Sequence, residues 1–473
     1  TNHLGGRIWT KSSGTPNDDA LSCMTNYDAT HLLIGGTTQS INDAMEGVII
    51  KLNHQAEEVW QKTISGPLNE DVRDLLVMES GKIIAIGTTT SFSDNQNVDW
   101  WICSLDGDGN TLWTSTFGTD MYENILSVTA DEDGNLYLWG HQNGPETTGY
   151  DGVLVKLDVQ GNEVWTRTFS LGANELAWDI VYMPEGDLLL SGDTNSAGQG
   201  GNDTYLIRLT TDGDVVWSKT FGSWSNDHGT SIVHHKNDMY MLNGGTASVG
   251  NGGIDYMSLF VNAMGDIKYT STYGGDLKDI ATTSIRTMDA GALLLGNTRS
   301  FGEGLYSALA VKIDQDARGA CMSNHTTEFV AEEIQFNIGN AVFTNRGEGI
   351  TVQNTAFPSF AESGLEYFVL CDNQIEGVVP SHISDVDEIS HNRLTLQPNP
   401  SNGYVRATVL VSDRLAGKLE LFNLEGRKVK EIMIPVGNAG EVRSYDISGL
   451  PEGIYLSRLS IGNQLETKKL IVE

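Results

Sequence analysis

Six acidic residues recur at one position of a sequence repeat, and they are the first candidates for binding chemistry. A ring of carboxylates at one end of a closed fold could hold a cation or a polyol. An Asp or Glu at a turn can instead accept hydrogen bonds from backbone N–H groups, and a residue present in every repeat is more typical of that structural role. We therefore interpret the set mainly as turn residues: Asp19, Asp71, Glu123, Glu175, Asp227 and Asp279.

Five tryptophans fall outside the main repeat position and are candidates for carbohydrate binding. An exposed indole can stack on the apolar face of a sugar, whereas a buried indole fills a hydrophobic core. Core packing is the more common fate, and glycan stacking is the functional alternative. The residues are Trp100, Trp101, Trp139, Trp178 and Trp224.

No familiar catalytic or cofactor motif is present in the chain. The run Asp106–Asn110 resembles the start of a calcium loop, but position six is Thr111 and position twelve is Phe117, which excludes an EF-hand. HExxH, GxSxG and phosphate-cradling glycine loops are missing from the sequence. We therefore predict no cofactor, with calcium kept as a weak alternative, no catalytic residue, and a protein that is not an enzyme.

The repeat that sets these positions is marked by an aromatic residue at Trp9, Trp60, Trp113, Trp165, Trp217 and Tyr269, with spacings of 51, 53, 52, 52 and 52 residues. Gly, or Ala in the first such turn, stands four residues before each of the last five aromatics. A second acid opens another apolar run at Glu46, Asp99, Asp151, Asp203 and Asp255. Each repeat therefore contains about four short strands joined by Gly, Asn and Asp turns.

Radial repetition of four-stranded units of this length is typical of a β-propeller. We predict six blades over residues 1–320, with the Trp9 strand completing the last blade and so covering an exposed edge. A seventh blade built from residues 321–372 is the alternative.

Residues 321–372 are predicted to be a β-rich connector bounded by Cys321 and Cys371, and residues 373–392 a linker. A disulfide between these two cysteines fits an extracellular protein, with two buried free thiols as the alternative. The pairing of Cys23 and Cys103 stays open.

The chain carries 29 Lys and Arg against 62 Asp and Glu, a net charge of −33, which argues against nucleic acid as a partner. Residues 393–473 hold 11 basic and 9 acidic side chains, a net +2, so residues 1–392 carry −35. No apolar run approaches the ~18 residues of a membrane span. The chain begins at Thr1 without Met, and we expect that a targeting segment has been removed.

Residues 393–473 read as about seven alternating strands, the pattern of a small β-sandwich of immunoglobulin type. The pieces PNPSNG, LFNLEGRKV, DISGLPEGIYL and KKLIV follow in order to the end of the chain. This segment resembles the type A sorting domain of the type IX secretion system of Bacteroidota. The matching residues include Pro398, Asn399, Pro400, Gly403, Gly426, Gly449, Gly453, Tyr455, Lys468 and Lys469.

That resemblance implies export through the outer membrane with the type IX translocon as partner, and a secreted or cell-surface location. The upstream repeat, for example KLDVQGNEVWTRTF at residues 156–169, resembles a propeller repeat of secreted Bacteroidota proteins that implies no settled activity. Many members of the sorting family lose the domain after export, whereas this chain extends through it to Glu473.

The charge division between the two parts favours self-association. We predict an exported structural or surface protein that assembles head to tail into a filament or layer, with the C-terminal domain of one copy on the acidic propeller of the next. The alternative is a propeller that binds carbohydrate, like an adhesin, or acts on polysaccharide.

Overall fold

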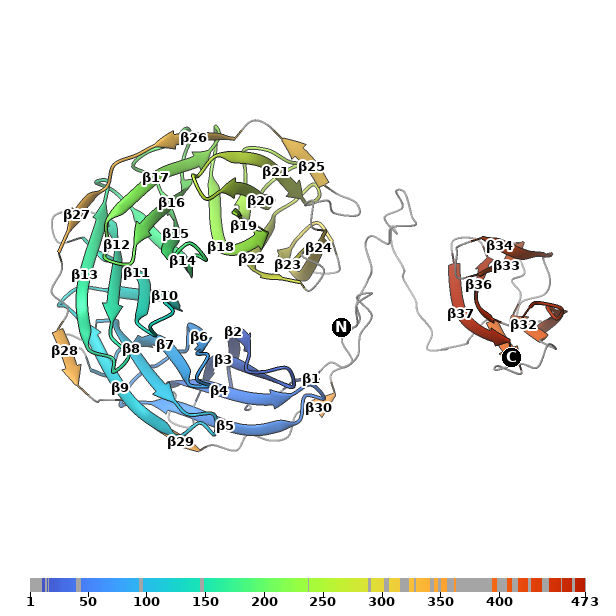
Figure 1. The fold of residues 1–473 in the computed structure, drawn as a ribbon, viewed down its shortest axis with the longest axis horizontal. Coiled ribbons are helices and arrows are strands. Elements are labelled where there is room, and N and C mark those ends of the chain that lie inside the picture. The colour runs from blue at the N-terminus through green and yellow to red at the C-terminus, as the bar shows by residue number, and fades with distance from the viewer. Residues whose placement is uncertain are drawn as a thin grey trace. The chain divides into compact units, whose positions relative to one another are not determined.

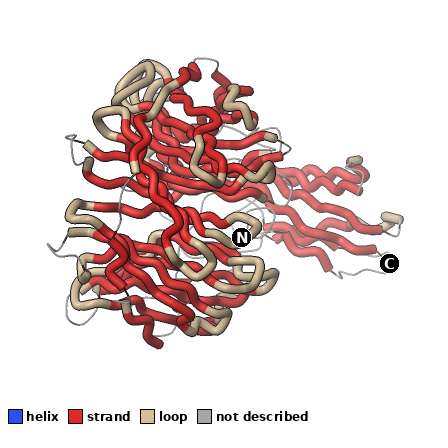
Figure 2. The backbone as a smooth tube through the Cα atoms, turned by 60° about the vertical axis from the view of Figure 1, so that its left-hand side comes forward, coloured by secondary structure: helices blue, strands red, loops and turns tan. Residues whose placement is uncertain are grey.

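The structure is a computed structural model of the 473-residue chain, and it consists of strands and loops (Figure 2). It describes residues 11–12, 15, 17–39, 44–92, 97–144, 149–236, 238–287, 291–301, 306–314, 323–326, 329–340, 344–347, 350–354, 361–362, 394–397, 406–410, 416–423, 427–435, 442–451, 453–461 and 464–472. The chain divides into two compact units, Thr1–Val378 and Val379–Glu473. Within the described residues, no helix is long and apolar enough to cross a membrane.

Six antiparallel sheets follow one another around a ring in the first unit, so the predicted propeller is confirmed (Figure 1). Blade one holds β2 (Asp19–Asn26), β3 (His31–Gln39), β4 (Met45–Asn53) and β5 (Glu58–Ser65). Blade two holds β6 (Asp74–Val77), β7 (Ile83–Thr89), β8 (Asp99–Leu105) and β9 (Thr111–Gly118). Blade three holds β10 (Glu123–Ala130), β11 (Leu136–Asn143), β12 (Tyr150–Leu157) and β13 (Glu163–Ser170).

Blades four to six continue the same order. Blade four holds β14 (Glu175–Tyr182), β15 (Asp187–Thr194), β16 (Asp203–Thr210) and β17 (Val215–Gly222). Blade five holds β18 (Asp227–Lys236), β19 (Met239–Thr246), β20 (Asp255–Asn262) and β21 (Ile267–Tyr273). Blade six holds β22 (Asp279–Arg286), β23 (Ala292–Thr298) and β24 (Ser307–Ile313). The first strand of each blade is the innermost one and faces the axis of the ring (Figure 1).

The turn before each repeated aromatic has the positive φ angle that its glycine predicts. Gly109, Gly161, Gly213 and Gly265 have φ values of 75°, 83°, 87° and 73°, and Ala56 replaces glycine in the first turn with φ 56°. A residue in this left-handed region costs little only when it is glycine. The glycine also lets the repeated indole of the preceding blade lie against the turn.

The connector forms a belt around the outer rim of the propeller. Its strands are β25 (Ser323–Thr326), β26 (Val330–Glu333), β27 (Asn337–Gly339), β28 (Thr344–Gly347) and β29 (Thr351–Asn354). They pair antiparallel with the outermost strands of blades five, four, three, two and one in that order, so the chain returns around the ring (Figure 1). We call residues 323–354 the belt, and its five strands cover edges that would otherwise be open to pairing with another chain.

A seventh blade is therefore ruled out for the described connector, because its strands join existing sheets. The predicted closing strand at Trp9 lies outside the described residues. The adjacent β1 (Lys11–Ser12) pairs with β30 (Ala361–Glu362), and no other pairing of β1 occurs among the residues described. Cys321, Cys371 and the linker 373–392 also lie outside them.

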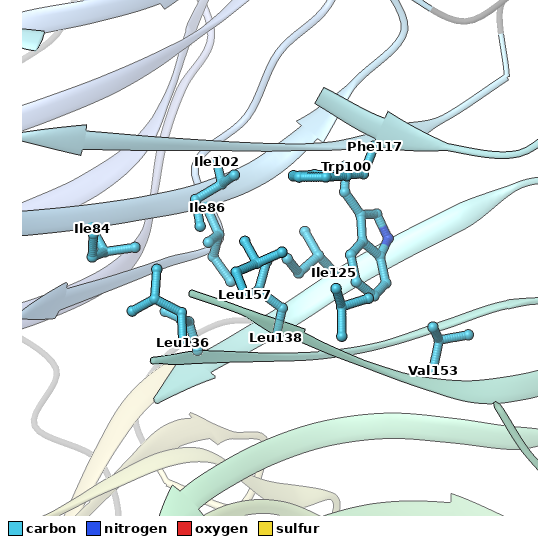
Figure 3. Packing of buried hydrophobic residues seen from close by; sticks show 12 residues of the cluster. Ile84, Ile86, Trp100, Ile102, Phe117, Ile125, Leu136, Leu138, Val153 and Leu157 are labelled. Carbon is cyan, nitrogen blue, oxygen red and sulfur yellow. The ribbon is translucent and has the colours of Figure 1, made fainter. Parts of the chain in front are cut away.

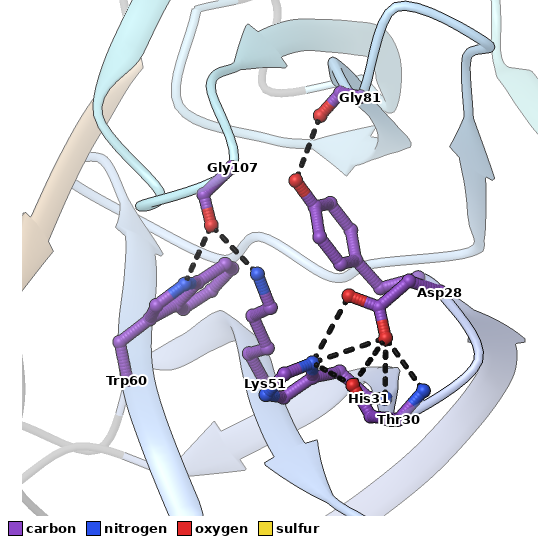
Figure 4. A network of polar contacts seen from close by, with 8 residues as sticks. Asp28, Thr30, His31, Lys51, Trp60, Gly81 and Gly107 are labelled. Atoms are coloured by element: carbon purple, nitrogen blue, oxygen red, sulfur yellow. Dashed lines mark hydrogen bonds and ion pairs between the residues drawn. The ribbon is translucent and has the colours of Figure 1, made fainter.

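Neighbouring blades are joined by hydrophobic clusters and by the repeated aromatics. One cluster places Trp100 and Ile102 of blade two against Ile125 and Leu138 of blade three (Figure 3). At the joint between blades one and two, Trp60 Nε1 donates to Gly107 O at 3.1 Å (Figure 4). Lys51 Nζ donates to the same carbonyl at 2.9 Å. The repeated Trp is thus a link between blades, as packing arguments predict.

Cys23 and Cys103 are free thiols that belong to the same hydrophobic cluster of blades one and two. Burial raises the pKa of each thiol to about 12. They therefore act as small apolar residues of the core.

The second unit contains two antiparallel sheets. One holds β31 (Leu394–Gln397), β32 (Arg406–Leu410) and β35 (Val442–Asp446). The other holds β34 (Lys428–Ile434), β33 (Gly417–Asn423), β36 (Gly453–Ile461) and β37 (Gln464–Val472). Ala407 and Val409 of the first sheet share a core with Leu419, Leu421 and Leu459 of the second, which is the predicted β-sandwich.

Candidate functional site

The first set of repeated acids is built into turns. Five of the six carboxylates accept a hydrogen bond from the backbone N–H four residues before them; for Glu175 and Asp227 the distance is 2.8 Å. Glu175 also accepts from the hydroxyls of Thr194 and Ser196 at 3.0 and 2.5 Å. In blade two this role belongs to Glu70, which accepts from Gly66 N at 2.6 Å, so the assignment of Asp71 was off by one residue. These bonds give the acids a structural role at the turns.

Three of the candidate glycan-binding tryptophans are core residues. Trp100, Trp101 and Trp139 are 0–1% exposed. Trp101 Nε1 donates to Asp71 O at 2.9 Å, and Trp139 Nε1 donates to Ser191 O at 2.8 Å. Their rings have no free face for a sugar, so the glycan-binding prediction is wrong for these three.

The other two tryptophans reach the surface. Trp224, in the loop between β17 and β18, is 69% exposed. Trp178 is partly buried on the innermost strand β14, within a β-bulge between Ala177 and Ile180. Bulges redirect a side chain away from the regular alternation of a strand.

Trp178 belongs to a polar cluster on the axial face. Its Nε1 donates to Asp193 Oδ2 at 2.7 Å. His228 Nδ1, from the innermost strand of blade five, lies 2.8 Å from the same oxygen. Gly229 N donates to Asp193 Oδ1 at 3.1 Å. One buried carboxylate thus orients an indole and an imidazole from two neighbouring blades.

The electrostatics of the cluster favour a charged His228. Its hydrogen bond to Asp193 raises the pKa of the imidazole above its ordinary value of 6.5 against the effect of burial. The ring is about a quarter exposed, with side-chain exposure of 27%. A protonated His228 can therefore present one N–H to the axis while the other holds Asp193.

A separate ion pair in blade two acts on His141, which contacts the strand that carries Trp178. The Arg73 guanidinium pairs with Asp71, with Nε 2.7 Å from Oδ2. Burial and the charge of Arg73 lower the pKa of His141 to about 4, and His141 Nδ1 accepts from Ala177 N at 3.3 Å. His141 is therefore neutral and sits next to the strand that carries Trp178. We call Trp178, Asp193 and His228 the axial cluster.

The axial cluster breaks the symmetry of the repeat. The positions equivalent to Trp178 in the other blades hold Ser22, Arg73, Leu126, Thr230 and Thr282. Those equivalent to His228 hold Ala20, Asp71, Asn124, Leu176 and Ile280. Structural residues of a repeat are expected to recur, whereas these differ from blade to blade. This departure is the signal in the sequence that could have singled out the cluster.

A pair of buried acids, Asp74 and Asp179, lies on the innermost strands β6 and β14 and is fully bonded. Ser127 Oγ is 3.2 Å from Asp74 Oδ2 and 2.8 Å from Asp179 Oδ1. Val128 N and Ile232 N donate to these carboxylates at 3.0 and 2.7 Å. Burial raises the pKa of Asp74 to about 7. These bonds link adjacent blades, and we assign the pair a structural role.

Of the sorting-domain residues, the structure describes Gly449, Gly453, Tyr455, Lys468 and Lys469. Gly449 has φ 84° and Gly453 φ 155°. Tyr455 is buried and its hydroxyl donates to Pro451 O at 2.7 Å. Lys468 and Lys469 lie on β37 opposite Ser457 and Leu456. Pro398, Asn399, Pro400, Gly403 and Gly426 are outside the described residues.

Residues 395–473 match the family model for the secretion system C-terminal sorting domain. The C-terminal unit belongs to this family. The match confirms the type IX export signal, a Bacteroidota origin, and a location at the cell surface or outside the cell. The sorting domain makes the secretion system a partner of the chain. No curated protein matches the chain.

Several solved structures resemble the chain at low similarity. An α-L-arabinofuranosidase from Fusarium graminearum has 9% identity and a TM-score of 0.41, covering 65% of this chain and 98% of its own. An exo-β-1,3-galactanase from Phanerochaete chrysosporium has 11% identity and a TM-score of 0.34, covering 99% and 98%. A family 43 arabinoxylan arabinofuranohydrolase from Bacillus subtilis has 10% identity and a TM-score of 0.25, covering 84% and 93%.

The prediction that the chain is not an enzyme is wrong, because the solved structures that resemble it are glycoside hydrolases. That prediction depended only on missing sequence motifs. Propeller active sites collect residues from several blades, and short motifs do not reveal such sites.

Proposed function

We propose that this exported protein binds polysaccharide at the axial cluster. The observation that carries the proposal is the shared carboxylate of Asp193, which fixes Trp178 and His228 at 2.7 and 2.8 Å on the innermost strands of blades four and five. Sites built from rigid strands hold side chains more precisely than loops do. The axial end of a propeller is also a place where several blades contribute to one site.

The residue types suit a sugar ligand. A partly buried indole whose N–H is already bonded offers its apolar face to a pyranose ring. His228 supplies an N–H donor for hydroxyl or carboxylate oxygens of the sugar. The strong acidity of the chain argues against a nucleic-acid ligand at the same place.

The test compares Trp178→Ala with Trp224→Ala on a glycan array, and measures release of reducing sugar from each bound polysaccharide. We expect the Trp178 variant to lose binding and the Trp224 variant to keep it, because only Trp178 belongs to the axial cluster. Binding that is lost only in the Trp224 variant would place the glycan on the exposed loop and contradict the axial site. Sugar release that disappears with Trp178→Ala would extend the proposal from binding to hydrolysis.

Head-to-tail association is a second proposal, supported by the division of charge between −35 in residues 1–392 and +2 in residues 393–473. Opposite charge steers encounter, and a heterologous contact that does not close builds a filament. Light scattering of the full chain and of residues 1–392 at low and high salt tests it. We expect a larger mass for the full chain at low salt only; equal masses in all four samples would refute the association.

A further inference from the structure

A line of polar side chains crosses the innermost strands of five successive blades. It begins on β6 and continues across β10, β14, β18 and β22, which face the axis of the ring (Figure 1). Its members are spaced 53, 52, 52 and 53 residues apart, so they occupy corresponding places in the repeat. We call this set the serine–aspartate network: Asp74, Ser127, Asp179, Ser231 and Ser284.

Successive members of the network are hydrogen bonded across the joints between blades. Ser127 Oγ lies 3.2 Å from Asp74 Oδ2 and 2.8 Å from Asp179 Oδ1. The Ser231 hydroxyl also bonds to Asp179. Ser231 Oγ lies 3.0 Å from Ser284 Oγ. The network therefore joins blades two to six through side chains.

On the side of blades five and six, the donors lead toward Asp179. Asn243 Nδ2 donates to Ser284 Oγ at 2.7 Å, so the proton of Ser284 is left for Ser231. Each hydroxyl has a single proton, and Ser231 can then give its own to Asp179. Ile232 N donates to the same carboxylate at 2.7 Å. Asp179 accepts every one of these bonds, as an ionised carboxylate does.

On the side of blade two, the network is short of one proton. The 2.8 Å contact assigns the single proton of Ser127 to Asp179. If both acids were ionised, Asp74 Oδ2 and Ser127 Oγ would face each other at 3.2 Å with lone pairs only. A proton on Asp74 Oδ2 makes this contact a hydrogen bond. The donors of both sides then converge on Asp179.

The two acids lack a cation that would balance a second negative charge. Among the residues that the structure describes, neither Asp74 nor Asp179 forms an ion pair. Arg73, which precedes Asp74, pairs instead with Asp71. Burial, and then the charge of Asp179, raise the pKa of Asp74 to about 7, and burial also raises the pKa of Asp179. The pair is therefore expected to hold one proton near neutral pH.

The strands packed against β6 bring few other titratable groups to Asp74. These strands are β2, β3, β7 and β10, and β7 has no titratable side chain. The charge of Asp74 acts on Cys23 of β2, whose thiol stays neutral because burial raises its pKa to about 12. The other titratable residues of these strands are Asp19, His31 and Glu123.

The charged groups beside Asp179 are already occupied. β14 packs against β11, β15 and β18. His141 of β11 has a pKa of about 4 and is neutral. Asp193 of β15 and His228 of β18 pair with each other at 2.8 Å. Asp179 therefore depends on the hydroxyl and backbone donors of the network.

We propose that the serine–aspartate network is a proton-dependent clasp, in which Asp74 carries a proton and Asp179 carries the negative charge. At acidic and neutral pH the clasp ties blades two to six together. Loss of the proton at higher pH places like charges on both sides of Ser127 and removes the bond between Ser127 and Asp74. The joint between blades two and three then becomes weaker. This inference is independent of the proposed glycan site.

The experiment uses the full chain and follows the Asp carboxyl carbons by NMR during a pH titration. Unfolding free energies are measured with denaturant from about pH 4.5 to about pH 6, below the titration of His228. Asp74→Asn removes the titrating group, and Asp179→Asn removes the neighbouring charge. Asp212→Asn, at an exposed hairpin turn, is the control for loss of one negative charge.

In the native chain and the control, the Asp74 carboxyl should titrate near pH 7 while Asp179 stays ionised. The folded state then keeps a proton that the unfolded state releases above the ordinary pKa of 3.8. Stability should therefore fall as the pH rises, by up to tenfold in the unfolding equilibrium per pH unit. Asp74→Asn should lose this part of the slope, and Asp179→Asn should lower the pKa of Asp74.

Two results would overturn the clasp. One is titration of Asp74 below about pH 5 in the native chain, which would mean that both acids are ionised at neutral pH, or that the proton resides on Asp179. The other is an equal slope of stability against pH in the native chain and in Asp74→Asn. If Asp74→Asn does not fold, the native titration alone decides between the two outcomes.

Discussion

The ring of Phe336 in the belt meets the ring of Phe169 in blade three edge to face, with centroids 6.0 Å apart. Phe336 also lies 5.2 Å from the ring of Tyr205 in blade four. Phe329 and Ile350 of the belt are buried in the same way, in clusters that combine blades four and five and blades one and two. The belt therefore inserts an apolar side chain between adjacent blades as it crosses them.

Removing such a side chain should weaken the propeller. Phe336→Ala is expected to lower the free energy of unfolding by about 2 kcal/mol, below the ~3–5 kcal/mol of a fully buried Phe because the ring is only partly covered. Ile338→Ala is the control, since this residue of the same belt is 43% exposed. Denaturant unfolding followed by Trp fluorescence measures both, and equal effects of the two changes would contradict the role of Phe336.

The repeated tryptophan at the joint between blades four and five makes a directional contact. Trp217 Nε1 donates to Ala263 O at 2.9 Å, and the indole lies against Gly265. Trp217→Phe keeps an aromatic ring but leaves this carbonyl without its indole donor, so we expect a loss of about 1–2 kcal/mol in unfolding free energy. Trp224→Phe removes an exposed indole and should change stability little. A loss confined to Trp224→Phe would refute the assignment.

The sequence predicts each part of the fold only as well as the length and regularity of its repeat allow. The 52-residue phase of the Trp60 to Tyr269 series predicts the blades well, because each unit contains complete hairpins with their turn residues. In the connector, a large apolar residue recurs every seven residues, at Phe329, Phe336, Phe343, Ile350 and Phe357. The strands of the belt are only three or four residues long. Strands this short carry too little alternation to be recognised without the edge that they cover.

The axial cluster was harder to predict, for a different reason. Trp178 and Trp139 both follow apolar residues in the sequence, and only the hydrogen bond from Trp178 Nε1 to Asp193 distinguishes the polar setting of Trp178 from the core position of Trp139. Asp193 follows the repeated glycine in the position that Thr88 or His141 holds elsewhere. The meeting of Asp193 with His228 is a tertiary contact between blades, which residue spacing alone does not encode.

The Asp193–His228 pair should make stability depend on pH near neutrality. Because the pKa of His228 is raised in the folded protein, the stabilising pair is fully present below about pH 6.5 and is lost as the pH rises through the folded pKa. His228→Gln should remove this dependence and leave the chain less stable at low pH than the native protein. Unfolding free energies measured from pH 5.5 to 8.5 test the slope, and an NMR titration giving a His228 pKa below 6.5 would contradict it.

The sorting domain should show the opposite dependence through Glu420. This buried carboxylate lies 2.8 Å from Arg458 and 3.2 Å from Lys428, and hydrogen bonds from Arg458 and then Lys428 and Lys418 lower its pKa to about 2. A depressed pKa contributes stability above its ordinary value of 4.5, and that stability is lost as the pH falls toward about 2. Amide exchange in β33 and β36 follows this unit within the full chain. Glu420→Gln should lower protection at pH 6 and flatten its decline between pH 5 and 2; a curve parallel to that of the native chain would show that the charge of Glu420 contributes no stability.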